Sequence, residues 1–208
     1  MIKKSKNYDG VSAFGQGGGK KLPAGGYVCK LMMAEEMQDR NGNPMLHIAF
    51  DILEGDFREY FMDTFKARKK ANADKPDAKE VKWPFEGQAW IQVLDWEDKT
   101  RESRKFKGFC TAVEESGSDI WTPNGELNLN ELKNAEVGVV FQNTEQEYNG
   151  DYSWRALPWG FRSVESIRSN DFFVPEDKPL PRVDGRGTGF ASVESADSFS
   201  AAEDDIPF

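Results

Sequence analysis

The sequence is poor in the residues that build metal centres and nucleophilic active sites. Its 208 residues include two cysteines, Cys29 and Cys110, and a single histidine, His47. Two cysteines so far apart suggest no disulfide framework, which fits a reducing compartment. With two distant cysteines and one histidine, no zinc site has enough nitrogen and sulfur ligands, and a Ser/His or Cys/His pair would have to use His47. We therefore expect no metal, no cofactor and no nucleophilic catalysis.

Long apolar runs are also missing. The segment MIKKSKNYDG at the N-terminus is basic, but no apolar stretch follows it. No run elsewhere approaches the length of a membrane span. We therefore expect no signal peptide, no membrane as a partner, and a protein of the cytoplasm.

Excess positive charge, which is typical of nucleic-acid binders, is absent from the chain as a whole. The net charge is -9, but its distribution is uneven. Residues 187–208 contain five acidic residues and no Lys or Arg, so residues 1–186 carry only -4. The body is close to charge balance, and a nucleic-acid site in it stays open.

What the chain does contain is a series of segments with strand and helix periodicity. Strands are expected from Gly26 through YVCKLMMAEE, in MLHIAFDIL with an extension to FREYF (57–61), in 88–96, in 137–143, and in a final broken strand, SWRALPWGFRSV. Pro158 places that last strand at an edge or a bend. Apolar residues at 106, 109, 110 and 113 predict a helix that ends near Gly117. The pattern is mainly β, with five strands and one helix between the third and fourth.

Three regions fall outside this pattern. Residues 1–22 are rich in Gly, Lys and Ser and predict a flexible arm, and the charged stretch 63–82 predicts a long loop or part-helical insertion. Residues 176–208 contain Pro, Gly and Ser without apolar periodicity and predict disorder. The predicted organisation is an arm (1–22), a folded domain (23–175) and an acidic tail (176–208).

Two motifs suggest other chemistry. GQGGGK resembles a phosphate-binding loop, but Phe14 and Lys21 stand where that loop needs Gly and Ser or Thr, so a flexible arm is the better interpretation. Asp95, Glu97 and Asp98 could bind magnesium as nucleases do, although acids at a strand end are usually only solvated.

Aromatic rings and cations are interleaved through the body. Proteins that bind single strands need this mixture, because cations follow the phosphates and flat rings stack on unpaired bases. Many of the rings must fill the core, yet in WRALPWGFR the neighbours Trp154 and Arg155 cannot both point inward from one strand. The candidates for nucleic-acid contact are Tyr60, Lys66, Arg68, Lys69, Lys70, Trp90, Trp154, Arg155, Trp159 and Arg162.

The sequence ends in EDDIPF, an apolar tip behind acidic residues. Phe208 offers a ring and a free carboxylate, so a partner pocket can bury the ring while a cation clamps the carboxylate. Pro207 limits the freedom lost on binding, and the acids would steer the tail to a basic rim. The candidates for partner contact are Asp204, Asp205, Ile206, Pro207 and Phe208.

This tip resembles the C-terminal end of bacterial single-stranded DNA-binding proteins, which typically ends Asp-Asp-Asp-Ile-Pro-Phe. The body differs from that housekeeping protein. Its stretches LPAGGYVCKLMMAEE, NPMLHIAFDILEGDFREYF, FKGFCTAVEES and LKNAEVGVVF are similar to phage or prophage single-stranded DNA-binding proteins of Gram-positive hosts. The resemblance implies an oligonucleotide/oligosaccharide-binding (OB) fold, and the five strands with one helix agree with it.

The expected function is therefore non-catalytic binding of single-stranded DNA by an OB-like barrel in the cytoplasm of the host cell. Host or phage replication, recombination and repair proteins would be recruited by the tip. Two alternatives stay open: a magnesium-dependent phage nuclease or recombination factor, and an adaptor that does not bind nucleic acid. The sequence does not decide between DNA and RNA, or whether the chain forms a homo-oligomer.

Overall fold

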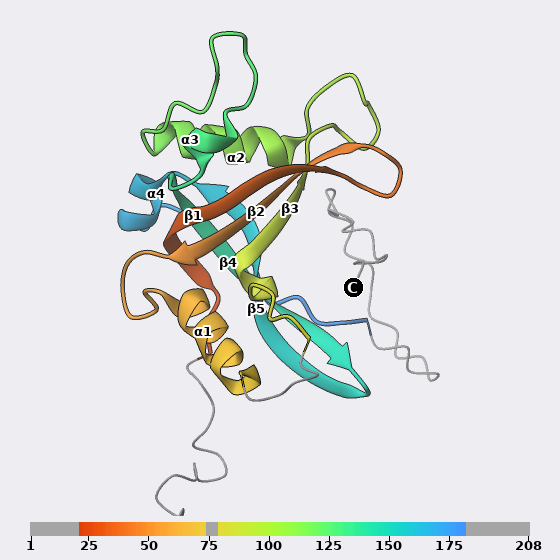
Figure 1. The fold of residues 1–208 in the computed structure, drawn as a ribbon, viewed down its shortest axis with the longest axis vertical. Helices are drawn as coiled ribbons and strands as arrows, with labels where there is room; N and C mark the ends of the chain where they lie inside the picture. The colour runs from red at the N-terminus through yellow and green to blue at the C-terminus, as the bar shows by residue number, and fades with distance from the viewer. Residues whose placement is uncertain (1–20, 74–78, 182–208) are drawn as a thin grey trace, which may run out of the picture.

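Five antiparallel strands form one sheet in the order β3-β2-β1-β4-β5 (Figure 1). The structure is a computed structural model, and it describes residues 21–73 and 79–181. The strands are β1 (Gly25–Gln38), β2 (Pro44–Ile52), β3 (Gln88–Gln92), β4 (Glu136–Tyr148) and β5 (Asp151–Arg162). The helical segments are α1 (Tyr60–Asn72), η2 (Phe85–Gly87), α2 (Arg104–Glu115), α3 (Leu129–Leu132) and α4 (Val164–Arg168). The prediction of a mainly β protein is confirmed.

Strand β1 is the central strand of the sheet, with β2 paired on one edge and β4 on the other. Cys29 lies opposite Ile52 on β2 and opposite Val137 on β4. The alternation of apolar side chains directs one face of each strand into a single core. The prediction for Pro158 is also confirmed: β5 is an edge strand, and its register shifts between Pro158 and Gly160.

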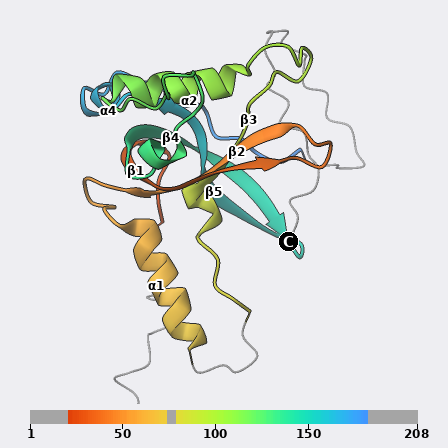
Figure 2. The ribbon, with the colours of Figure 1, turned by 45° about the horizontal axis from the view of Figure 1, so that its top comes forward.

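The two longest helices lie at opposite ends of the sheet (Figures 1 and 2). Helix α2 is the predicted helix between the third and fourth strands, and the Ser103 side chain caps it by accepting from the Phe106 backbone N–H. Phe109 anchors α2 on β5 with its ring 5.0 Å from that of Phe161, in an edge-to-face arrangement. Helix α1 instead projects away from the sheet (Figure 1).

A cluster of rings fastens α1 to the sheet. Phe61, the second residue of the helix, is fully buried. Its ring lies 6.0 Å from Phe50 on β2 and 6.2 Å from Phe141 on β4. Gly87 allows η2 to approach this cluster, because a Cβ there would lie 2.8 Å from Cγ of Phe61. Together these contacts fix α1, η2 and β4 relative to one another.

Two predicted strands differ from the structure, and one region left open between two alternatives is now assigned. FREYF does not extend β2. Glu59 adopts a left-handed conformation, and the Asp51 carboxylate accepts from the backbone N–H groups of Phe61 and Met62, so the chain begins α1 here. The stretch expected to be a loop or part-helical insertion is helical as far as Asn72. The third strand ends at Gln92 and not at Trp96, because the chain turns back and Ser103 N–H donates to the Val93 carbonyl.

The described parts of the predicted arm and tail touch the sheet. Leu22 is buried in the core. The backbone N–H of Lys178 donates to Asn143 O, and Lys178 O accepts from Glu145 N–H, so residues 176–181 continue alongside β4. Residues 1–20 and 182–208, which hold most of the predicted arm and tail, lie outside the described residues.

Candidate nucleic-acid interface

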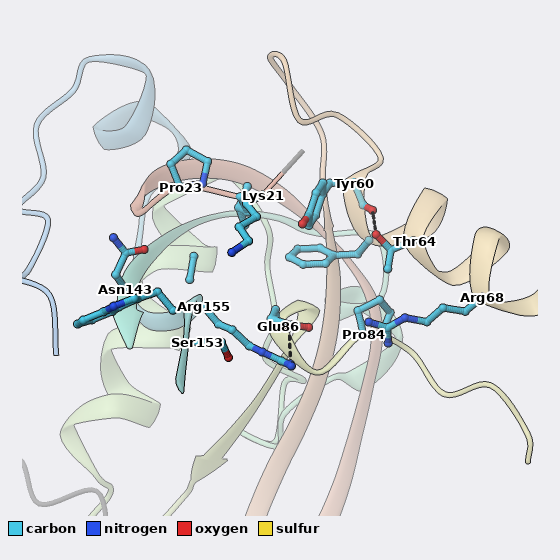
Figure 3. Close-up of a pocket in the computed structure, with 14 residues that line it drawn as sticks. Lys21, Pro23, Tyr60, Thr64, Arg68, Pro84, Glu86, Asn143, Ser153 and Arg155 are labelled. Carbon is cyan, nitrogen blue, oxygen red and sulfur yellow. Dashed lines mark hydrogen bonds and ion pairs between the residues drawn. The ribbon is translucent and has the colours of Figure 1, made fainter. Parts of the chain in front are cut away.

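An open groove of about 500 Å³ separates α1 from the β4–β5 hairpin. We call it the α1–β5 groove. Lys21 to Pro23 form its upper rim, α1 contributes one wall through Tyr60, Thr64 and Arg68, and η2 lies at its base with Glu86. The opposite wall is Asn143 on β4 and residues 153–156 on β5 (Figure 3). Four of the ten nucleic-acid candidates, Tyr60, Arg68, Trp154 and Arg155, line this one groove.

Positive charge outweighs negative charge along the groove. Its cations are Lys21, Arg68 and Arg155, and its acid is Glu86. Arg155 reaches across from β5, and its Nη1 donates to Glu86 Oε1 over 3.0 Å (Figure 3). A groove with this charge attracts anions even though the whole chain carries -9.

Two aromatic residues line the groove on opposite walls. Tyr60 is half-buried, and its ring lies edge-on to Phe61 at 5.2 Å and to Phe57 at 5.9 Å, which holds it in place. Trp154 on β5 is 41% exposed. A ring that is fixed on one side and open on the other can stack on an unpaired base.

The remaining cations predicted on the α1 side lie on α1 but outside the groove lining. Lys66, Lys69 and Lys70 are exposed, and the last two lie in the final turn, where the helix dipole favours positive charge. The last two turns of α1 therefore carry positive charge next to the groove residue Arg68.

The structure places Trp90 elsewhere. This ring stacks flat on His47 at 4.7 Å, and Phe85 stacks at 5.5 Å, on the outer face of β2 and β3. His47 Nδ1 is 2.7 Å from Glu35 Oε1, and its Nε2 is 2.8 Å from Gln88 Oε1. Trp90 belongs to this local stack and does not line the groove.

Trp159 and Arg162 lie further along β5, beyond the groove lining. Trp159 is the additional residue at the register shift, is 41% exposed, and contacts Phe173 edge-on at 6.4 Å. Arg162 is half-buried, donates to the Phe161 carbonyl, and lines a smaller hollow beside α2. Four of the ten candidates therefore line the groove and three lie elsewhere on α1. Trp90 lies in the stack with His47, and Trp159 and Arg162 lie further along β5.

The acidic loop proposed for magnesium uses its carboxylates internally. Asp95 Oδ1 accepts from the backbone N–H groups of Glu97 and Asp98, which lower the pKa of Asp95. Hydrogen bonds from Thr100 likewise lower the pKa of Asp98. In residues 21–73 and 79–181, no three His, Cys, Asp or Glu side chains come together to hold a metal ion.

The two thiols are buried and poorly suited to nucleophilic attack. Burial raises the pKa of Cys110 to about 12 and raises that of Cys29 well above its usual value. Because the thiolate is the reactive form, both groups are held in the unreactive state at neutral pH.

Two charged residues of the groove were not among the sequence candidates. Lys21 was assigned to a flexible arm, and Glu86 carries no motif. Tyr148 is 76% exposed but does not line the groove. The Asn149-Gly150 turn beside it marks the tip of the β4–β5 hairpin in the sequence. The partner candidates Asp204 to Phe208 lie outside the described residues.

Comparison with known proteins assigns no family. Neither a scan against protein-family models nor a search of curated proteins finds a match to this chain. Across the described part of the chain, no helix combines the length and the apolar composition that a membrane crossing requires.

Proposed function

We propose that the protein binds single-stranded DNA without catalysis, and that the strand lies in the α1–β5 groove. The observation that carries this proposal is that two aromatic residues on opposite walls, Tyr60 and Trp154, line one open groove together with three cations. Rings accept unpaired bases and cations accept phosphates, which is the chemistry of single-strand binding. A duplex buries the faces of its bases within the base stack, so the two rings could not stack on them.

The sheet supports an OB-like fold as the scaffold. Its central β1 is paired with both β2 and β4, and α2 lies between β3 and β4 in the chain. The Arg155–Glu86 ion pair links β5 to the segment that starts β3, which is where an OB barrel would close. In this fold the ligand often lies on the face of strands 2 and 3, where Trp90 is found. A Trp90→Ala variant therefore tests whether the strand lies on that face instead.

The wider role follows from the resemblance of the sequence to phage single-stranded DNA-binding proteins. In that role the protein coats exposed strands in the host cytoplasm, and its C-terminal tip recruits replication, recombination or repair proteins. The acidic residues near the tip and the terminal Phe208 support a docking function for the tail.

The proposal is tested by titrating the full-length protein with labelled oligo-dT, oligo-rU and duplex DNA at several salt concentrations. We expect oligo-dT to bind more tightly than duplex, with an affinity that falls steeply as salt rises. Trp154→Ala should cost about 1–3 kcal/mol of binding free energy, and Trp90→Ala much less.

Each other outcome identifies a different function. Equal affinity for single strand and duplex, or no binding to either, would contradict the proposal, and no binding would favour an adaptor. Loss of the labelled strand that depends on magnesium would instead indicate a nuclease. A larger loss from Trp90→Ala than from Trp154→Ala would move the strand to the β2–β3 face.

A further inference from the structure

Glu86 is an acidic side chain inside a groove whose other charged side chains are all positive. The η2 segment holds it there: Pro84 and Gly87 on either side are buried, and Gly87 packs against Phe61. The side chain of Glu86 is only 21% exposed, against 46% for its partner Arg155. The carboxylate is therefore a fixed part of the groove and not a mobile surface charge.

The three groove cations differ in their partners. Arg155 donates to Glu86 over 3.0 Å. Within the described ranges, no ion pair involves Lys21 or Arg68. Only the cation on the β5 wall, next to the exposed ring of Trp154, is thus neutralised by a resident acid.

We propose that Glu86 competes with the phosphates of the strand for Arg155. This inference rests on the proposed function and names the residue that sets how tightly the groove holds its ligand. In the free protein, Glu86 occupies the guanidinium that a phosphate needs. A strand must displace that carboxylate or share the guanidinium with it, and either route weakens binding.

The chemistry of the two anions explains why the exchange is possible. A guanidinium binds carboxylate and phosphate oxygens with the same planar fork, so a phosphate can take the place of Glu86 without moving β5. The freed carboxylate then lies close to the phosphate and repels it. Glu86 therefore favours release of the strand, a useful property for a protein that must yield DNA to polymerases or recombinases.

The inference is tested with Glu86→Gln, which keeps the size of the side chain and removes its charge. We expect this variant to bind oligo-dT about fivefold more tightly than the wild type, with the largest gain at low salt. Glu54→Gln is the matched control, because Glu54 also pairs with an arginine, Arg168, but does not line the groove. It changes the net charge equally and should alter affinity less than about twofold.

A double-mutant cycle shows whether the effect passes through Arg155. In an Arg155→Met background, adding Glu86→Gln should give a clearly smaller gain, because the competed cation is absent and only the direct repulsion between carboxylate and phosphate is removed. An equal gain in that background, or a gain no larger than that of Glu54→Gln, would overturn the inference. If the wild type fails to bind oligo-dT at all, the proposed function fails instead.

A second variant covers the case in which Glu86→Gln destabilises the fold. Glu86→Asp keeps the charge but withdraws the carboxylate from Arg155 by one methylene group. Tighter binding by a folded Glu86→Asp protein supports the competition, and unchanged affinity refutes it. Thermal melting shows whether each variant is folded, and only the DNA affinity of a folded variant is compared with that of the wild type.

Discussion

At the scale of single residues, Asp51 explains why α1 starts where it does. Its carboxylate comes from β2 and is buried. Oδ1 accepts from the backbone N–H groups of Ile52 and Phe61, and Oδ2 accepts from that of Met62. The residue at the usual capping position, Glu59, makes no side-chain cap, so a strand residue caps the helix in its place.

Removing this acceptor should destabilise the protein. Asp51→Ala leaves buried N–H groups without a partner, and we expect it to lower the free energy of unfolding by about 1–3 kcal/mol. Asp51→Asn retains one oxygen for Ile52 and Phe61 and should cost less. Urea unfolding followed by circular dichroism measures both changes, and equal stability of all three proteins would show that Asp51 does not cap α1.

The same residue gives a pH dependence with a defined sign. Burial raises the pKa of the Asp51 carboxyl above its ordinary value, and this effect outweighs the backbone hydrogen bonds, which lower it. As the pH falls from about 7 to about 4, the folded state takes up this proton before the unfolded chain does. The stability of the wild type relative to Asp51→Asn should therefore improve toward acid pH, and the opposite trend would refute the assignment.

At the scale of elements, sequence periodicity predicted the strands and helix α2, which depend on local patterns of apolar residues. Alternating residues identified the strands, and the apolar spacing 106, 109, 110 and 113 identified α2, whose buried face contains those four positions. Helix α1 was predicted only as one alternative, a part-helical insertion, because its KARKK segment has no apolar stripe. It is held by the burial of Phe61 and by Asp51, which lies ten residues from Phe61 in sequence, and neither contact is visible as a period.

The same limit applies to the interface. Composition correctly marked rings and cations as candidates, but only the fold separates Trp154, in the groove, from Trp90, stacked on His47. Both tryptophans lie on strands, and periodicity alone does not say which strand surface borders the groove. Glu86 could not be predicted as a groove residue because its place depends on the packing of η2 against Phe61.

The basic surface of α1 should contribute to binding through charge alone. Lys69→Gln with Lys70→Gln removes two exposed cations beside the groove. If both contact phosphates, the slope of log affinity against log salt should fall by about 1.4, since each phosphate contact on a single strand contributes about 0.7. Salt-dependent titration with oligo-dT measures this slope.

A matched control exists at the other end of the sheet. Arg104→Gln with Lys107→Gln removes two exposed cations from α2 and changes the net charge equally. This pair should leave the slope nearly unchanged, because α2 lies far from α1 (Figure 2). Equal slopes for the two double variants would mean that net charge, and not the α1 surface, governs binding.

At the scale of the whole molecule, charge is divided between a nearly balanced body and an acidic C-terminal segment. The chain carries -9, of which residues 187–208 contribute -5. The last described residues before that segment, 176–181, run beside β4, and Asn143 at the groove wall donates to Asp177 over 3.0 Å. Residues 177 and 178 therefore lie against one wall of the proposed DNA site.

Partner capture and DNA binding should be separable in this segment. Phe208→Ala removes the terminal ring and keeps every charge, so it should abolish capture of replication or recombination proteins while leaving oligo-dT affinity unchanged. Deleting residues 203–208 also removes three acids, and affinity should then stay the same or rise, most clearly at low salt. Pull-downs from host lysate with both variants, beside DNA titrations, measure the two effects. If Phe208→Ala retains every partner, the tip only adds charge, and the resemblance to bacterial single-stranded DNA-binding proteins does not extend to its function.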